Sequence, residues 1–158
     1  MNRLIKKIFQ VVALITVMGA TTNILHAQEE DTVQNVIDDI QIDIKSATVD
    51  VKNNRATIEL YLISYQRNAR EFKLNTFATQ VVDAKRQMYM YTSMQMGKVL
   101  VKLVDRQNYL NYFMEDGVPV PLKITVDNWP KTAKPSKLKL VFEDSTEQGK
   151  FIEKAVNL

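Results

Sequence analysis

The residues of this chain best suited to bind a metal ion are four methionines in two Met-x-Met pairs, Met88 with Met90 and Met94 with Met96. Thioether sulfur is a soft ligand that selects Cu(I). All four would share one face of a single strand, because alternate residues of a strand point to the same side. We favour a buried stripe in which flexible methionines fill gaps in a core. The chain has no cysteine and one histidine, His26, so we predict no metal site and no cofactor.

A second group of residues suggests binding rather than catalysis. The segment from Asp105 to Phe113 concentrates amides, a guanidinium and aromatic rings between two expected strands. Rigid rings with polar tips suit interaction surfaces, and rings flanked by amides can stack on a sugar. We therefore predict an interaction loop here, the alternative being a connection whose Leu110 and Phe113 cap the core. The predicted binding residues are Arg106, Asn108, Tyr109, Asn111, Tyr112 and Trp129.

Trp129, in the run Asp-Asn-Trp-Pro, is the only tryptophan. Its place at the end of an expected strand has two interpretations. It is either an exposed anchor for a partner or a plug over one end of the core. We favour the plug, because tryptophan is highly buried on average.

Catalytic patterns are weak. Asp38 with Asp39, and Glu115 with Asp116, are carboxylate neighbours, but neighbours on a strand point to opposite faces and do not form a glycosidase pair. No nucleophile motif and no phosphate-binding glycine loop is present. We therefore predict that the chain is not an enzyme, and a hydrolase remains a distant alternative.

The N-terminus predicts export. Three basic residues precede an apolar run from Ile8 to Met18, and small and polar residues follow. This is the layout of a secretory signal peptide, and the run is shorter than the roughly 20 residues of a spanning helix. We expect a signal peptide over residues 1–27, cleaved after Ala27, and a periplasmic or secreted product without a stable transmembrane anchor.

The mature chain is expected to begin with an acidic lead-in over residues 28–39, which is solvated. Without the signal, the chain carries 18 basic and 18 acidic side chains. A neutral balance argues against steering toward nucleic acid, which we do not expect as a partner.

From residue 40 onward, the apolar residues recur with a period of two. Ile40 to Ile44 and Ala47 to Val51 alternate on opposite parity, which predicts a bulge at Lys45 and Ser46. Ala56 to Tyr65 has the strongest strand pattern. Further strands are expected around Phe72–Leu74, Thr79–Ala84, Met88–Met94, Lys98–Val104, Leu122–Val126, Leu138–Phe142 and Phe151–Val156.

Short strands without intervening helices indicate a single all-β domain over residues 40–158. We predict one antiparallel β-sandwich. The expected core includes Ile58, Leu60, Leu62, Val81, Leu100, Ile124, Leu138, Leu140 and Phe142.

Four stretches carry a family resemblance: IDIKSATVDVKNNRATIELYLISY, VVDAKRQMY, EDGVPVPLKITVDNWP and KLKLVF. Together they resemble small exported immunoglobulin-like domains of uncharacterised function, which often carry a D-x-x-G-x-x-Y hairpin. That hairpin matches Asp83 to Tyr89, with Arg86 in the place of the glycine. The resemblance implies an immunoglobulin-like architecture and an exported location, and it implies no activity.

These observations lead to one functional hypothesis and its alternatives. We expect a non-enzymatic interaction module of the cell envelope that binds a partner protein through exposed strand edges or the Tyr109 loop. The alternative is a glycan-binding module that uses Tyr109 and Tyr112. A Met-rich Cu(I)-binding protein is, like a hydrolase, a distant third.

Overall fold

The computed structural model describes residues 35–158, which form antiparallel β-sheets without any α-helix in that range. The prediction of an all-β chain is confirmed. Residues 1–27, the expected signal peptide, lie outside the described residues. Within residues 35–158, no helix has the length and apolar character needed to cross a membrane.

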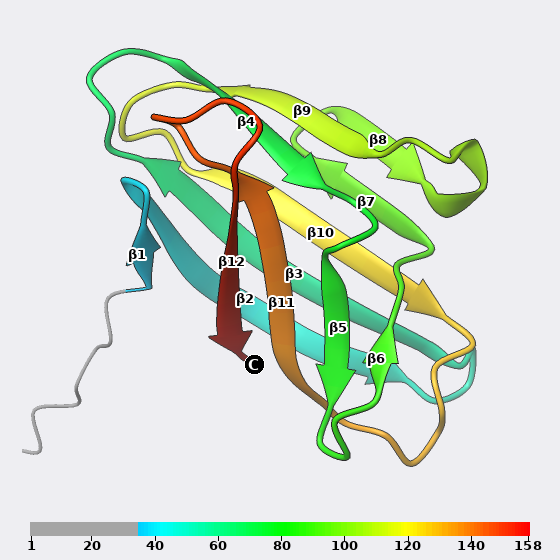
Figure 1. The fold of residues 1–158 in the computed structure, drawn as a ribbon. Helices are drawn as coiled ribbons and strands as arrows, with labels where there is room; N and C mark the ends of the chain where they lie inside the picture. The colour runs from blue at the N-terminus through cyan, green and yellow to red at the C-terminus, as the bar shows by residue number, and fades with distance from the viewer. Residues whose placement is uncertain (1–34) are drawn as a thin grey trace, which may run out of the picture. The chain divides into compact units, whose positions relative to one another are not determined.

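Twelve strands and one short 3-10 turn make up the fold (Figure 1). In chain order they are β1 (Val36–Ile37), β2 (Ile40–Asp50), β3 (Arg55–Ser64), β4 (Arg70–Asn75), β5 (Gln80–Asp83), β6 (Met88–Tyr89), β7 (Ser93–Met96), β8 (Val99–Lys102), η1 (Leu103–Asp105), β9 (Tyr109–Met114), β10 (Val120–Asp127), β11 (Pro135–Glu143) and β12 (Phe151–Asn157).

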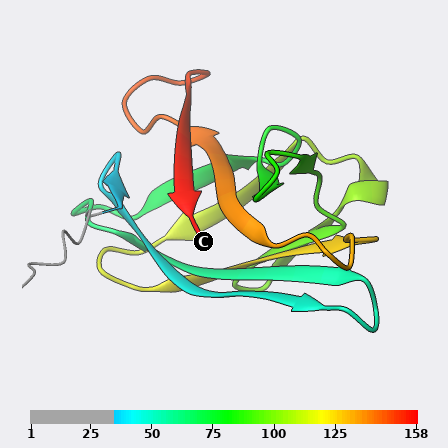
Figure 2. The ribbon, with the colours of Figure 1, turned by 90° about the horizontal axis from the view of Figure 1, so that it is seen from below.

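The strands form two sheets. Sheet A has the order β1-β2-β3-β10-β7-β8, and sheet B has the order β6-β5-β11-β4-β9, with β12 also paired to β11. Figure 2 shows β2 and β3 in one layer and β11 and β12 in the other. The chain passes repeatedly between the sheets, and the inner faces of both contribute to one apolar core.

Strands β4 and β5 follow each other along one side of β11, while β12 occupies its other side (Figure 1). Side chains stabilise the turn between β4 and β5. The Asn75 side-chain oxygen accepts the Ala78 N–H at 3.0 Å, and the Thr79 hydroxyl accepts the Val141 N–H at 3.1 Å. Because this turn separates the two strands, β4 pairs with β9 while β5 pairs with β6.

The strongest sequence patterns are confirmed. The predicted strand from Ala56 to Tyr65 is β3, shifted by one residue at each end. The predicted bulge in β2 is present as a register shift between Ile44 and Ser46. Because a one-residue insertion re-aims the side chains that follow, this bulge brings Lys45 beside Glu59 of β3, with 3.2 Å between their charged atoms.

The predicted core is correct except at one position. Leu100 is 50% exposed, while its neighbour Val101 is buried. Leu100 lies opposite Gln95 of β7, and Val101 lies opposite the buried Met94. In β8 it is therefore Val101, and not Leu100, that points into the core. The other predicted core residues are all buried: Ile58, Leu60, Leu62, Val81, Ile124, Leu138, Leu140 and Phe142.

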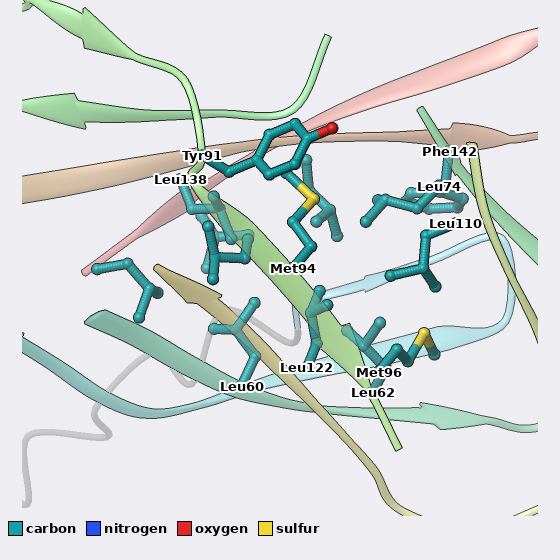
Figure 3. Packing of buried hydrophobic residues seen from close by; sticks show 14 of the residues in the cluster. Leu60, Leu62, Leu74, Tyr91, Met94, Met96, Leu110, Leu122, Leu138 and Phe142 are labelled. Carbon is teal, nitrogen blue, oxygen red and sulfur yellow. The ribbon is translucent and has the colours of Figure 1, made fainter. Parts of the chain in front are cut away.

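The four methionines do not form one stripe, because the predicted strand from Met88 to Met94 is two strands in different sheets. The chain crosses from β6 to β7 after Tyr89, and Tyr91 fills the core at this crossing. Met94 and Met96 are fully buried, whereas Met88 is 55% exposed. Figure 3 shows Met94, Met96 and Tyr91 in the same apolar cluster. The pattern therefore offers no site with four thioether ligands.

The described end of the acidic lead-in is folded. Asp38 and Arg70 form an ion pair at 2.7 Å, with both side chains less than one-tenth exposed. Arg70 also donates to the Asp38 carbonyl at 2.8 Å, and the Ser145 N–H donates to the Asp38 carboxylate at 3.0 Å. A buried charge needs such partners, so this cluster links the β1–β2 turn to β4 and to the β11–β12 loop.

Candidate functional site

The predicted Tyr109 loop is a strand in the structure. β9 pairs with β4 in continuous antiparallel register, and the three residues of η1 form a short 3-10 turn before it. Along β9, Leu110 and Met114 are buried, whereas Tyr109, Asn111 and Phe113 are exposed on the outer face of sheet B. The alternation follows from the period of two of a strand.

Tyr109 is part of an aromatic pair that spans sheet B. Its ring stacks on that of Phe151 from β12, with 5.7 Å between centroids and 10° between planes. The ammonium group of Lys73 lies 4.6 Å from the Tyr109 centroid and 5.8 Å from that of Phe151. Because a cation is attracted to an aromatic face, Lys73 holds the two rings in place.

Lys73 is itself held by Glu143 of β11. Their charged atoms lie 3.2 Å apart, and the Glu143 carboxylate also accepts the Gly149 N–H at 2.7 Å. The Gly149 N–H and Lys73 together hold the pKa of the Glu143 carboxyl below its ordinary value. The ion pair therefore stays charged at neutral pH and keeps the ring pair on a rigid base.

Phe113 extends this surface. It lies opposite Glu71 of β4 and is 66% exposed. Next to Glu71 is a polar hollow of about 360 Å³, lined by Glu71, Glu143, Asp144, Ser145, Thr146 and Gln148. We name the surface formed by Lys73, Tyr109, Asn111, Phe113 and Phe151 the Tyr109 face.

The structure brings only some of the predicted binding residues to this face. Tyr109 and Asn111 lie on it. Arg106 and Asn108 are exposed in the loop that leads into β9, where Arg106 takes the left-handed conformation at φ 52°. The Asn108 carbonyl accepts the Thr76 N–H at 3.0 Å, which fixes that loop to the end of β4.

Tyr112 does not share the outer face. It is half-buried, packs against the core and covers Gly97 in the β7–β8 turn. A side chain at position 97 would have its Cβ 2.6 Å from the Tyr112 hydroxyl oxygen. The glycine is therefore the reason that this ring can close over the turn.

Trp129 is a plug. Its side chain is 1% exposed, its Nε1 donates to the Ala133 carbonyl at 2.9 Å, and its ring lies 4.3 Å from that of Tyr89. It belongs to the β10–β11 loop and not to the Tyr109 face, as the positions of β9 and that loop in Figure 1 indicate. No surface ligand reaches it. We name Asp83, Tyr89, Trp129 and Ala133 the Trp129 end.

The hairpin from Asp83 to Tyr89, which matches the D-x-x-G-x-x-Y pattern except at Arg86, positions Tyr89 at the Trp129 end. Asp83 accepts the N–H groups of Lys85 and Gln87 at 2.8 and 2.9 Å and the Tyr89 hydroxyl at 3.1 Å. Burial by itself raises the pKa of the Asp83 carboxyl, but these three hydrogen bonds outweigh it and hold the pKa below its ordinary value. Arg86 takes φ 67°, the conformation that glycine adopts most readily.

The edges formed by β2, β8 and β12 are poorly suited to pairing with another strand. β2 carries its bulge at Lys45, and β8 is only four residues long, with Lys98 just before it and Lys102 as its last residue. On β12, Lys154 lies opposite the buried Leu140 and so points to the core side. Bulges, short strands and inward charges all discourage edge pairing. At these three strands, faces are therefore better candidates than edges for an interaction. The remaining long edge strand is β9, which carries Tyr109, Asn111 and Phe113 itself.

Three members of the Tyr109 face were missed by the sequence analysis. Lys73 and Phe151 belong to strands far away in sequence, and no local pattern connects them to Tyr109. Phe113 was assigned to the core in the alternative interpretation, and its exposure contradicts that assignment. A correct strand assignment for residues 109–114 would have placed Phe113 outward, because it shares the parity of Tyr109 and Asn111.

Within residues 35–158, no three His, Cys, Asp or Glu side chains gather in a group that could hold a metal ion. The comparisons with known proteins add no constraint: no family model, curated protein or solved structure matches the chain.

Proposed function

We propose that this chain is an exported, non-enzymatic interaction module of the cell envelope, an immunoglobulin-like β-sandwich that binds a partner protein through the Tyr109 face. The signal-peptide pattern in residues 1–27 supports export to the periplasm or beyond. Two antiparallel sheets around a common core support the sandwich architecture.

The exposed aromatic surface carries the proposal. Phe113 is 66% exposed on a strand, and the stacked Tyr109 and Phe151 rings lie on the same side of sheet B. Aromatic residues dominate protein interfaces, because they bury large areas at small cost in side-chain entropy. The rings are already ordered by Lys73, so binding a partner loses little further freedom.

A protein partner fits this face better than a glycan. The glycan hypothesis needs Tyr109 and Tyr112 together, but Tyr112 is turned toward Gly97 and the core. The Tyr109 and Phe151 rings also stack on each other, so one flat side of each ring is already covered. Phe113 offers an edge and a side to an apolar pocket on a partner.

The test is affinity purification of the tagged full chain from its native envelope, as wild type and as the double variant Tyr109→Ser, Phe113→Ser. We expect one protein to be enriched by the wild type and to lose affinity for the variant by at least about thirtyfold, the effect of one interface hot spot. Affinity is then measured with the purified partner by biolayer interferometry.

The matched control is Val51→Ser, which removes an exposed apolar side chain in the β2–β3 turn. It should bind the partner as the wild type does. Equal recovery of the same proteins by the wild type and the double variant would contradict the proposal, as would the absence of any enriched protein.

A further inference from the structure

The outer face of sheet A carries a second surface that differs in chemistry from the Tyr109 face. Along β3 the outward side chains are Thr57, Glu59, Tyr61 and Ile63, which alternate with buried residues. Two hollows follow each other along this strand. One, of about 360 Å³, is lined by Asp43, Tyr61, Ile63 and Pro119. The other, of about 160 Å³, is lined by Lys45, Glu59, Leu60, Gln95, Gly97, Pro121, Leu122 and Lys123.

Asp43 is held in a fixed position at the larger hollow. The Gln41 side-chain amide donates to both of its carboxylate oxygens, at 2.8 and 2.9 Å. The Tyr65 hydroxyl donates in turn to the Gln41 side-chain oxygen at 2.7 Å. Within residues 35–158, no basic side chain lies within ion-pair distance of Asp43. The carboxylate is therefore oriented and ready to accept hydrogen bonds from a ligand.

The smaller hollow has its charges balanced internally. Glu59 lies between Lys45 and Lys123, at 3.2 and 3.7 Å. The hydrogen bond and the charge of Lys45 lower the pKa of the Glu59 carboxyl, so all three groups are ionised at neutral pH. Together with Asp43, the lining of the two hollows carries two acidic and two basic side chains, so its net charge does not attract a charged ligand.

Tyr61 supplies the apolar element between these polar groups. It lies opposite Pro121 of β10, and Lys45 sits 5.7 Å from its ring centroid. The Tyr61 ring and Pro121 together present apolar surface of the kind that the C–H face of a sugar can cover. The surrounding carboxylates, amide and ammonium groups then match its hydroxyls.

We propose that the outer face of sheet A binds a neutral glycan along β3. Tyr61 stacks on a sugar ring, and the Asp43 carboxylate accepts hydrogen bonds from the sugar hydroxyl groups. The hollows extend from Ile63 to Glu59, about 13 Å of strand, which accommodates a short oligosaccharide. Because this site and the Tyr109 face share no residue, the proposal is independent of the partner-protein function.

The test is affinity electrophoresis of the full chain in gels that contain hydroxyethylcellulose, laminarin or dextran, with alginate as an anionic comparison. We expect at least one uncharged polymer to retard the wild type. Tyr61→Ala should weaken the apparent affinity by about tenfold or more, because the stacking surface is lost. The isosteric Asp43→Asn should weaken it severalfold, because charge-assisted hydrogen bonds become neutral ones.

Two control variants make the result specific. Thr57→Ala alters the same face of β3 outside both hollows, and Phe113→Ser alters the Tyr109 face, so both should migrate as the wild type does. Melting temperatures confirm that each variant is folded. If Tyr61→Ala does not fold, the comparison of the wild type with Asp43→Asn still decides the test. Absence of retardation by every uncharged polymer overturns the proposal. Retardation by alginate alone, or equal binding by wild type and Asp43→Asn, also overturns it.

Discussion

The Trp129 end and the Tyr109 face are built from similar parts and have opposite exposure. Each contains a pair of aromatic rings, Tyr89 with Trp129 at 4.3 Å and Tyr109 with Phe151 at 5.7 Å. Each has a carboxylate that holds the pair, through the Tyr89 hydroxyl at one end and through Lys73 at the other. Yet Trp129 is 1% exposed, whereas Tyr109 is 38% exposed.

Ring pairs with local polar support are thus buried at one place in this fold and exposed at another. At the Trp129 end, the β5–β6 hairpin and the β10–β11 loop close over the rings, and the Ala84 N–H donates to the Lys134 carbonyl across them at 3.0 Å. On the Tyr109 face, no segment of the described chain covers the rings to the same extent. We expect the first pair to contribute to stability, and under the proposed function the second pair contacts a partner.

The largest effect that separates the two regions is expected from paired truncations. Trp129→Ala removes a fully buried ring and should lower the free energy of unfolding by about 3–5 kcal/mol. Phe113→Ser changes an exposed side chain and should stay within about 0.5 kcal/mol of wild type. Urea denaturation followed by circular dichroism measures both. Similar losses in the two variants would show that Phe113 belongs to the core and would end the comparison.

An intermediate effect is expected at Gly97, which lets Tyr112 pack inward while its neighbours on β9 face outward. Gly97→Ala combines backbone strain at φ 54° with a Cβ 2.6 Å from the Tyr112 hydroxyl. Gly117→Ala has comparable strain at φ 69° and nothing within 4 Å of its Cβ. Left-handed backbone costs an alanine roughly 1–2 kcal/mol, so Gly117→Ala should lose about that much and Gly97→Ala clearly more.

The same denaturation experiment measures this difference, and the near-ultraviolet circular dichroism of Gly97→Ala should also change as Tyr112 moves. If the two alanine variants lose equal stability, the packing of Tyr112 over Gly97 is not a significant contribution.

The smallest expected effect sharpens the account of the Trp129 end. Arg86 adopts φ 67° in the hairpin that carries Asp83 and Tyr89. Arg86→Gly relieves that strain and should raise the free energy of unfolding by roughly 0.5–1 kcal/mol. Lys85→Gly, a neighbour without a positive φ, should lower it by a similar amount. Thermal unfolding detects both, and a loss of stability in Arg86→Gly would refute the strain argument.

Much of the fold followed from local patterns. The alternation over β3 and the parity change at Lys45 were both predictable, because the period of a strand is a local property. The prediction failed where the chain changes sheets. Met88, Met90 and Met94 share one parity in the sequence, but the crossing at Tyr91 divides them between two sheets.

The sequence by itself determined that the chain is all-β, which residues of β3, β10 and β11 enter the core, and that Trp129 favours burial. These features depend on side-chain period and size, which each segment carries with it. Only the tertiary structure decided that residues 109–114 form a strand beside β4, that Phe151 stacks on Tyr109, and that Asp43 and Tyr61 border one hollow. The reason is physical: these contacts join strands that are distant in the chain, and their neighbours are set by sheet pairing and by the register between strands.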